Sequence, residues 1–301
     1  MNRWQHLIDQ SNSIIADGAM GTMLQQAGLQ ASDLPVLWNV DHPDRVQAIQ
    51  RAYLDAGAQI LLTNTFNGNR FRLARHGLES RIDELNRAGA QILRAEVEAY
   101  LKRNAAVTVE PLVAGDMGPS GELLAPLGKL SFEDAVAGFE QQARALIAGG
   151  SDVIWIETMA DLEEVRAAVE GTRRASAEIP LIATMTFDTH GRTIMGIKPE
   201  TAAATLSGWG VAAFGGNCGN GPDEIVSVIQ KMHAAMPAAI LVAKPNAGLP
   251  EMVNGATVYR ATPETMANAA LQLRAAGARI IGGCCGTSPA HIAAMARALK
   301  D

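Results

Sequence analysis

Short runs of β-branched and apolar residues alternate eight times with longer amphipathic stretches along this chain. The predicted strands are Ser13–Met20, Gln59–Phe66, Leu112–Met117, Asp152–Met159, Leu181–Asp188, Val211–Cys218, Ile240–Asn246 and Ala278–Cys285. The clearest helical patterns between them cover Ser131–Ile147, Leu162–Arg174, Pro222–Met236 and Pro263–Ala275. Strands that alternate with helices pair in parallel, and eight such units close a barrel. We therefore expect residues 1–301 to form one α/β domain, a (βα)8 TIM barrel.

Polar residues gather at the carboxyl ends of the predicted strands. Asp17-Gly18, Glu157-Thr158 and Asn217-Cys218 are three of these ends. A barrel brings all such ends to one face, where catalysis takes place in this architecture. A doubly wound open sheet is the main alternative, but no GxGxxG follows the first predicted strand. The barrel explains the polar ends better, because an open sheet would spread them along an edge.

The three cysteines of the chain all lie at such strand ends. Cys218 ends the sixth predicted strand, and Cys284 and Cys285 end the eighth. A free cysteine is often just a small buried hydrophobe. In a barrel, however, one strand separates these two ends, so the three thiols lie within reach of one metal ion. Gly286, after the adjacent pair, permits the sharp turn that would let both cysteines face one ion.

Three thiolates favour zinc, because soft sulfur ligands and tetrahedral geometry suit this ion. Three protein ligands leave a fourth position open, which is typical of a catalytic zinc site. Three thiolates around Zn²⁺ carry a net charge of about −1, which makes the metal a poor source of hydroxide. Such a zinc is suited to hold an incoming thiol as a nucleophilic zinc-bound thiolate. We predict Cys218, Cys284 and Cys285 to be both metal ligands and catalytic residues.

Charge and hydropathy exclude several partners. The net charge is −6 and the 25 basic residues are scattered, so we expect no nucleic-acid binding. The apolar runs are shorter than the roughly 18 residues of a membrane-spanning helix, and no membrane partner is expected. The N-terminal residues lack the apolar core of a signal peptide. We therefore expect a cytoplasmic protein.

Seven sequence segments together resemble the homocysteine S-methyltransferase family. In chain order they are DGAMGTML, LLTNTF, GDMGPSGELLAPLG, IWIETM, GGNCG, AKPNAGLP and GGCCGT. The resemblance spans Ile15 to Leu299 and is closest to the homocysteine-binding branch of cobalamin-dependent methionine synthases. It implies a (βα)8 barrel, zinc on three cysteines, and transfer of a methyl group to homocysteine to form methionine.

The resemblance also implies roles for residues around the cysteines. Asp17 and Glu157 match positions that bind the amino group of homocysteine, and backbone amides in the glycine-rich turns near Gly18 and Gly21 are suited to help bind its carboxylate. Asn246 matches a position that supplies the fourth zinc ligand when substrate is absent. Asn217 is a further substrate-binding candidate, because it precedes Cys218 and can orient the site.

The methyl donor is left open among a methylcorrinoid, S-methylmethionine and betaine. The chain ends without corrinoid or folate domains, so a separate corrinoid protein acting in trans is one expected partner. The long loop Gly118–Lys129 suits a lid or a wall that faces the donor. Two alternatives to this function are a metal- or thiol-binding regulatory barrel without catalysis, and the same chemistry on another thiol or a selenol.

Overall fold

The computed structural model describes residues 2–30, 32–253 and 256–300. Its strands are β1 (Ile14–Ile15), β2 (Ile60–Leu62), β3 (Leu112–Met117), β4 (Val153–Met159), β5 (Leu181–Met185), β6 (Ala213–Cys218), β7 (Leu241–Pro245), β8 (Glu251–Val253), β9 (Ala256–Val258) and β10 (Ala278–Ile281). Eight of them form one sheet in the order β1-β10-β7-β6-β5-β4-β3-β2, and every pair is parallel. A bridge between Ala16 and Ile60 joins the two outer strands, so the sheet is nearly closed. The predicted (βα)8 barrel is confirmed.

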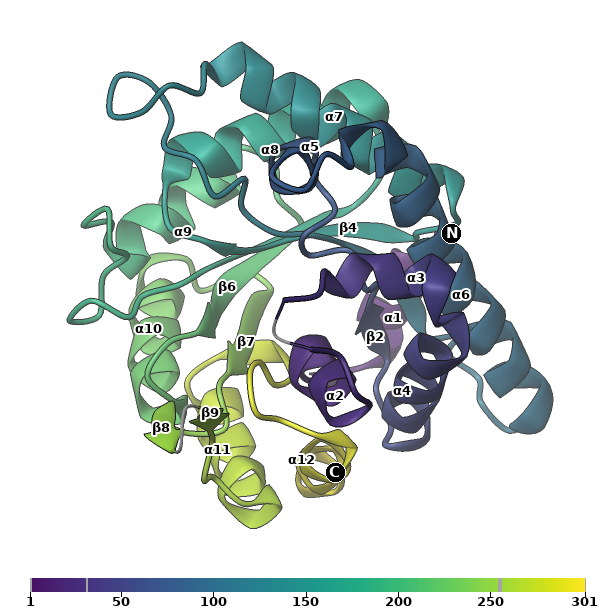
Figure 1. The fold of residues 1–301 in the computed structure, drawn as a ribbon. Coiled ribbons are helices and arrows are strands. Elements are labelled where there is room, and N and C mark those ends of the chain that lie inside the picture. Colours follow the sequence, from purple (N-terminus) through teal and green to yellow (C-terminus); the bar gives the residue numbers. More distant parts are fainter. Residues whose placement is uncertain (1, 31, 254–255, 301) are drawn as a thin grey trace.

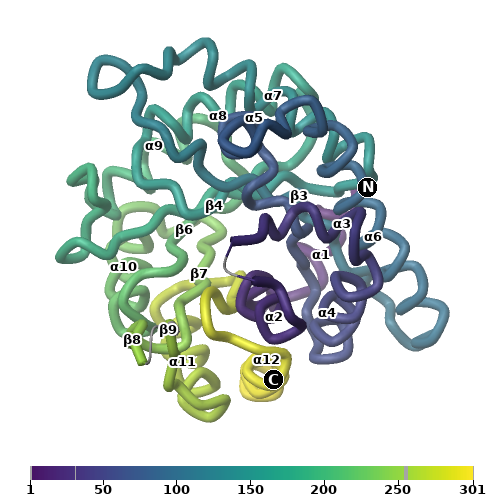
Figure 2. Tube along the Cα trace, in the orientation of Figure 1, coloured from purple at the N-terminus to yellow at the C-terminus, as the bar shows by residue number. Residues whose placement is uncertain are grey.

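Helices surround this sheet in chain order (Figures 1 and 2). They are α1 (Arg3–Gln10), α2 (Met20–Gln26), α3 (Trp38–Asp41), α4 (Pro43–Asp55), α5 (Arg70–Ala74), α6 (Ile82–Arg103), α7 (Phe132–Ala148), α8 (Leu162–Ala175), α9 (Pro199–Gly208), α10 (Pro222–Ala235), α11 (Pro263–Ala275) and α12 (Pro289–Leu299), with 3-10 turns η1 (Pro35–Leu37) and η2 (Glu79–Arg81). The helices α7, α8, α10 and α11 match the four predicted helical segments to within one residue at each end. In the described part of the chain, no helix combines the length and apolar character needed to cross a membrane.

Local sequence explains where these helices begin and end. At the start of α7, the Ser131 hydroxyl accepts a hydrogen bond from the Asp134 backbone N–H at 3.1 Å, which caps the first turn. After the end of α7, Gly150 adopts φ 101°, a conformation that favours glycine. The chain then enters β4 directly. α11 repeats this combination, with the Thr262 side chain capping its start and Gly277 at φ 107° after its end.

The core has two parts, because successive strand residues point to opposite faces of the sheet. Outward residues pack against the helices in one large cluster. Inward residues fill the barrel with a second cluster that contains Trp155 of β4. The helix α1 lies across the amino-terminal end of the barrel and adds Trp4, Leu7 and Ile8 to this inner cluster. The barrel is therefore filled and closed at one end.

β3, β4 and β6 end at the predicted residues, whereas other strands of the sheet end earlier than predicted at the carboxyl-terminal face. β1 ends at Ile15 rather than Met20, and β10 ends at Ile281 rather than Cys285. In both places single backbone hydrogen bonds still tie the chain to the neighbouring strand, from the Asp17 N–H to the Ile60 carbonyl and from the Gly282 N–H to the Ala243 carbonyl, each at 3.0 Å. The loop after β7 also contains a small antiparallel hairpin, β8–β9, which the sequence pattern did not indicate.

Candidate functional site

A ring of ionisable side chains lies one layer above the apolar filling of the barrel. Trp155 marks the top of that filling, and its indole N–H donates to the Thr184 hydroxyl at 3.2 Å. The next inward residue of β4 is Glu157, and it lines the same cavity as Lys244 of β7 and as Asp116 of β3, which is the register partner of Trp155. Along β4, therefore, the inward position directly after the apolar filling of the barrel already carries an ionisable side chain of the cavity.

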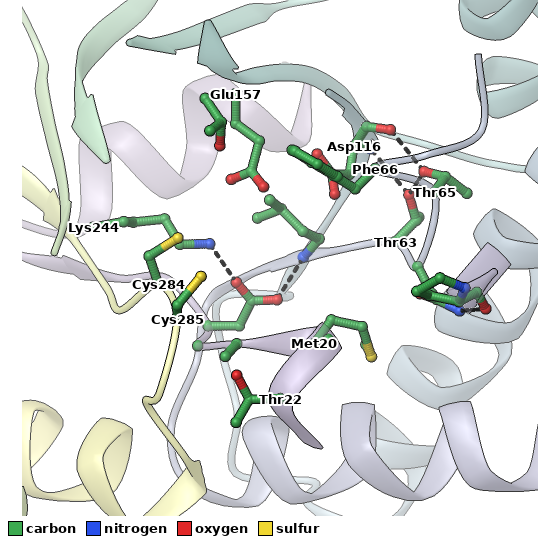
Figure 3. Close-up of a pocket in the computed structure, with 18 of the residues that line it drawn as sticks. Met20, Thr22, Thr63, Thr65, Phe66, Asp116, Glu157, Lys244, Cys284 and Cys285 are labelled. Carbon is green, nitrogen blue, oxygen red and sulfur yellow. Dashed lines mark hydrogen bonds and ion pairs between the residues drawn. The ribbon is translucent and has the colours of Figure 1, made fainter. Parts of the chain in front are cut away.

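These side chains line a cavity of about 280 Å³ at the carboxyl-terminal face. Figure 3 shows the carboxylates of Glu157 and Asp116 on one side of it and Lys244, Cys284 and Cys285 on another. Of the predicted site residues, those that line the cavity are Asp17, Gly18, Glu157, Cys218, Cys284 and Cys285. Asn217 and Asn246 lie behind its wall, both buried.

The three cysteine sulfurs form a compact group. All three Sγ atoms lie within 4.8 Å of one another, and those of Cys218 and Cys284 are 2.9 Å apart. Zinc–sulfur bonds of about 2.3 Å place tetrahedral ligands about 3.8 Å apart, and these separations lie within about 1 Å of that value. Side-chain rotations suffice to bridge such differences. The residues therefore fit a metal ion that prefers sulfur.

Unusual backbone conformations near the cysteines set the directions in which their side chains point. Cys218 adopts φ 59° and Thr158 adopts φ 61°, conformations that are costly for residues with a side chain. Gly286, after the cysteine pair, has φ 78°. The turn that was expected at Gly286 is confirmed, and it redirects Cys285 from the alternation of a regular strand.

The end of β7 holds both cysteine-bearing segments in place. The Cys284 N–H donates to the Pro245 carbonyl at 2.8 Å, and the Asn246 N–H donates to the Cys218 carbonyl at 3.3 Å. The Asn246 side chain donates through Nδ2 to the Gly219 carbonyl at 2.7 Å. Its Oδ1 is buried and has no hydrogen-bond partner among the described residues. An oxygen in this state is available as a ligand.

Asn217 connects two strand ends rather than facing the cavity. Its Oδ1 accepts from the Thr158 backbone N–H at 3.0 Å, and its Nδ2 donates to the Thr158 hydroxyl at 2.7 Å. Nδ2 also lies 3.5 Å from the Cys218 sulfur. The bonds to Thr158 stabilise its unusual backbone conformation beside Cys218.

A buried ion pair joins Asp17 to Lys244, which the sequence reasoning did not identify. The lysine Nζ lies 2.8 Å from Asp17 Oδ1, and both side chains are almost fully buried. Asp17 Oδ2 accepts from the Leu62 backbone N–H at 2.8 Å. The same ammonium lies 5.1 Å from the ring centre of Trp155, within the range of a cation–π contact. The sequence feature that could have indicated this ion pair is a lysine at an inward position near the end of a strand.

Burial shifts the pKa values of the cavity groups. Burial chiefly raises the pKa of Glu157, to about 8, although Lys244 opposes the shift. Burial and then the charge of Glu157 raise the pKa of Asp116 well above its usual value. For Lys244, burial acts to lower the pKa, but Asp17 and Glu157 outweigh it and raise the pKa. The cavity therefore combines the acidic side chains of Asp17, Asp116 and Glu157 with one lysine, Lys244, that stays protonated.

Gly18 allows the chain to pass tightly along the cavity wall. A Cβ at this position would lie 2.7 Å from the Thr287 hydroxyl and 2.9 Å from the Tyr53 ring. Thr287 and Tyr53 also bond the next residue: the Thr287 hydroxyl accepts from the Ala19 N–H, and the Tyr53 hydroxyl donates to the Ala19 carbonyl. The backbone of this turn is therefore held rigidly against the segment that carries Cys284 and Cys285.

Comparisons with known proteins agree with this geometry. Residues 14–299 match the family described as homocysteine S-methyltransferase. The chain is 34% identical to a methionine synthase of Mycobacterium tuberculosis and 33% identical to one of Mycobacterium leprae. These matches cover 96% and 95% of this chain but 25% and 24% of the relatives, so the chain spans about a quarter of their length.

A solved structure shows the same architecture over the whole chain. The metallated form of the homocysteine methyltransferase MmuM from Escherichia coli superposes with a TM-score of 0.83 and 29% identity. The match covers 98% of this chain and 100% of that structure. Together with the family match over residues 14–299, this similarity identifies the chain as a member of the homocysteine S-methyltransferase family.

Proposed function

We propose that this protein is a zinc-dependent methyltransferase that converts homocysteine to methionine. The observation that carries the proposal is the group of three cysteine sulfurs within 4.8 Å of one another, at a cavity that is also lined by buried carboxylates. Cys218, Cys284 and Cys285 would hold the metal. The unpartnered Oδ1 of Asn246 supports a role as fourth ligand when no substrate is present.

Zinc, when bound, would favour the thiolate form of an incoming thiol, whose ordinary pKa is about 8.5. The protein's own residues would orient that thiol. Asn217 fixes the backbone beside Cys218 through Thr158, and the Pro245 carbonyl fixes Cys284. The thiolate sulfur then attacks the methyl carbon, and the bond from that carbon to the donor breaks with its electron pair leaving on the donor. The residues around the cysteines would therefore contribute by positioning the thiol rather than by transferring a proton.

The amino-acid part of homocysteine would lie on the opposite side of the cavity from the sulfurs. Glu157 reaches into the cavity from β4 and is suited to bind the ammonium group. The turn at Gly18 supports binding of the carboxylate, because it forms part of the wall. Asp17 also faces the cavity, but both of its oxygens already accept bonds from Lys244 and Leu62. Its contact with substrate stays a prediction.

For the methyl donor we propose a methylcorrinoid presented by a separate protein. Betaine and S-methylmethionine are cations that aromatic cages recognise well, and Phe66 is the one aromatic residue among the described residues that line the cavity. Exposed apolar side chains, by contrast, occupy three loops that follow β3, β5 and β7 on the same face as the cavity. They are Leu123, Leu127, Ile194, Leu249 and Met252. Such an apolar rim suits a protein partner.

The test is methionine formation by zinc-loaded protein with homocysteine and, in separate reactions, betaine, S-methylmethionine, methylcobalamin and a methylated corrinoid protein. We expect turnover with the two corrinoids and the higher rate with the protein-bound one. Turnover with betaine or S-methylmethionine alone would contradict the donor assignment and leave homocysteine methylation intact. Cys218→Ala should lose both bound zinc and activity.

The same assay separates the alternatives. A regulatory barrel without catalysis would bind zinc and homocysteine but would form no methionine with any of the donors. A different acceptor would show itself as faster methylation of another thiol, or of selenohomocysteine, than of homocysteine at equal concentration. Full activity of the Cys218→Ala variant without zinc would contradict the proposed role of the metal.

A further inference from the structure

The loop that contains the hairpin β8–β9 carries a residue that the proposed function does not yet use, Tyr259. It follows β9 directly and is half-buried. Among the described residues it lies outside the lining of the cavity, so it is not placed to touch a substrate. Its hydroxyl instead donates a hydrogen bond to the Cys285 thiol. Tyr259 therefore contacts the group of three cysteines from outside the cavity.

The tyrosine also packs directly on the backbone that follows the cysteine pair. A Cβ at Gly286 would lie 2.3 Å from both Cβ and Cγ of Tyr259, so the tyrosine needs a glycine at this point. The Gly286 N–H donates to the hydroxyl of Thr22 on α2 at 3.3 Å. The turn after Cys285 is therefore held by α2 as well as by Tyr259.

Hydrogen bonds at both ends of the hairpin loop fix where Tyr259 lies. The Ala247 N–H, before the hairpin, donates to the Cys285 carbonyl at 2.9 Å, and the Ala261 N–H, after it, donates to the Ala247 carbonyl at 3.0 Å. Nε2 of His291 on α12 lies 2.9 Å from the Ala261 carbonyl. These contacts tie the loop to the same segment that Tyr259 covers, so its side chain is presented to Cys285 in a defined position.

The other two sulfurs of the group receive a donor from β6. Nδ2 of Asn217 lies 3.5 Å from the Cys218 sulfur and 3.9 Å from the Cys284 sulfur. Cys285 comes after the end of β10 and receives a donor from the hairpin loop. Hydrogen bonds to charged groups are stronger than those between neutral groups, so a thiolate gains more from such a donor than a thiol does. Tyr259 thus supplies to Cys285 what Asn217 supplies to the other two thiols.

We propose that Tyr259 is a positioning residue of the metal centre, whose hydroxyl holds the Cys285 thiolate towards the other two and stabilises part of their shared negative charge. The inference rests on the proposed function, because it takes Cys218, Cys284 and Cys285 as the metal ligands. Three thiolates around a divalent ion leave a net charge of about −1, and hydrogen-bond partners of the ligands orient them and tune the metal. The hairpin β8–β9, which adds no strand to the barrel, would serve to deliver this hydroxyl.

The test is Tyr259→Phe, which removes only the hydroxyl. Competition with a chromophoric chelator measures zinc affinity, and we expect it to fall by about 10- to 100-fold, which is the usual cost of losing such a partner. In protein loaded with Co²⁺, the sulfur-to-metal charge-transfer band should move to longer wavelength, because a thiolate without its hydrogen bond gives up electrons more readily. Tyr100→Phe is the matched control, because Tyr100 is a half-buried tyrosine on α6 outside the cavity lining; it should change neither measurement.

A second variant, Tyr259→Ala, separates the hydroxyl from the ring. If the ring alone positioned Cys285 by packing, Tyr259→Phe would keep the zinc affinity and the Co²⁺ band of the unsubstituted protein, and only Tyr259→Ala would lose affinity. That pattern would overturn the proposal. Metal-free Tyr259→Phe should unfold at the same temperature as the metal-free unsubstituted protein, and a clearly lower temperature would indicate a structural role and count against it.

An unsubstituted protein that binds no zinc would instead contradict the proposed function, whatever the variants do. An unsubstituted protein that binds one equivalent of zinc, together with a Tyr259→Phe variant of the same affinity, would contradict only the role of Tyr259. The two failures are therefore distinguishable in one set of titrations.

Discussion

The two ends of the barrel are built from the same eight strands but have opposite character. At the amino-terminal end, α1 covers the opening and buries Trp4, Leu7 and Ile8 against the inward residues of the strands. At the carboxyl-terminal end, the inward positions are occupied by Asp116, Glu157 and other ionisable groups around a cavity. Close packing stabilises the first end, whereas the second accepts the cost of buried charge.

This difference shows how a barrel separates stability from chemistry. Trp155 stands between the two parts, with apolar residues beneath it and the Lys244 ammonium close to its ring. A change below this level should therefore alter folding without altering the site, and a change above it should act mainly on the site, with a smaller effect on folding. Three substitutions test this separation, in decreasing order of expected effect.

The largest effect is expected from Cys284→Ser at the carboxyl-terminal end. Serine is a poor ligand for a metal that prefers sulfur, so bound zinc should fall from one equivalent to near zero, and methionine formation should drop by at least about 1,000-fold if the metal activates the thiol. Metal analysis and a single-turnover assay measure both. Stoichiometric zinc with near-normal turnover would show that this thiol does not hold the metal.

A smaller effect, on folding alone, is expected from Leu7→Ala at the amino-terminal end. Leu7 is fully buried in the inner cluster, and loss of a buried leucine costs about 3 kcal/mol of unfolding free energy. Denaturant titration measures this loss, and homocysteine affinity should not change at a temperature where the variant is folded. Leu271→Ala on α11 is the matched control, because Leu271 is 39% exposed; its effect should stay below about 0.5 kcal/mol. A large loss of affinity in Leu7→Ala would show that the two ends are coupled.

The smallest effect is a change in pH dependence in Glu157→Gln. In the folded protein the pKa of Glu157 is raised to about 8, so its stabilising contribution is present below its unfolded pKa of about 4.3. That contribution is lost as the pH rises towards 8, with a slope of at most about 1.4 kcal/mol per pH unit. Glutamine does not titrate. The stability of metal-free wild type relative to the variant should therefore fall between pH 5 and pH 8, as measured by denaturant unfolding.

A constant difference between the two proteins across that pH range would mean that Glu157 is not protonated in the empty cavity. Asp116, whose pKa is also raised, remains in both proteins. Because the charge of Glu157 is one cause of that shift, Glu157→Gln also returns the pKa of Asp116 towards its usual value, so the measured pH dependence belongs to the two carboxyl groups together.

Much of the architecture was predictable because strand and helix periodicity is local. The eight barrel strands and the four helices named in advance are confirmed, and the three cysteines gather as expected, with Cys218 at the end of β6 and Cys284 and Cys285 just after the end of β10. The α1 cover and the β8–β9 hairpin were not predicted. Short segments of this kind gain their stability from the surface that they pack against rather than from their own pattern.

Among the site residues, too, some were predictable from local sequence and others depend on tertiary contacts. The sequence motifs drew attention to Asp17 and Glu157, and the structure places both at the cavity. The pairing of Asp17 with Lys244 joins residues 227 positions apart, and no local pattern records such a contact. The lack of a hydrogen-bond partner for the Asp116 Oδ1 likewise could not be predicted from the sequence, because it depends on which donors the neighbouring strands bring near.

The sequence by itself determined the alternation of strands and helices, and with it the barrel and the face on which the polar strand ends meet. It also determined that three thiols would gather there, because strand order follows from chain order in such a fold. Only the tertiary structure decided which acidic groups the protein neutralises internally and which remain available to a ligand. That distinction arises from distances between strands and from burial, both of which exist only once the barrel is closed.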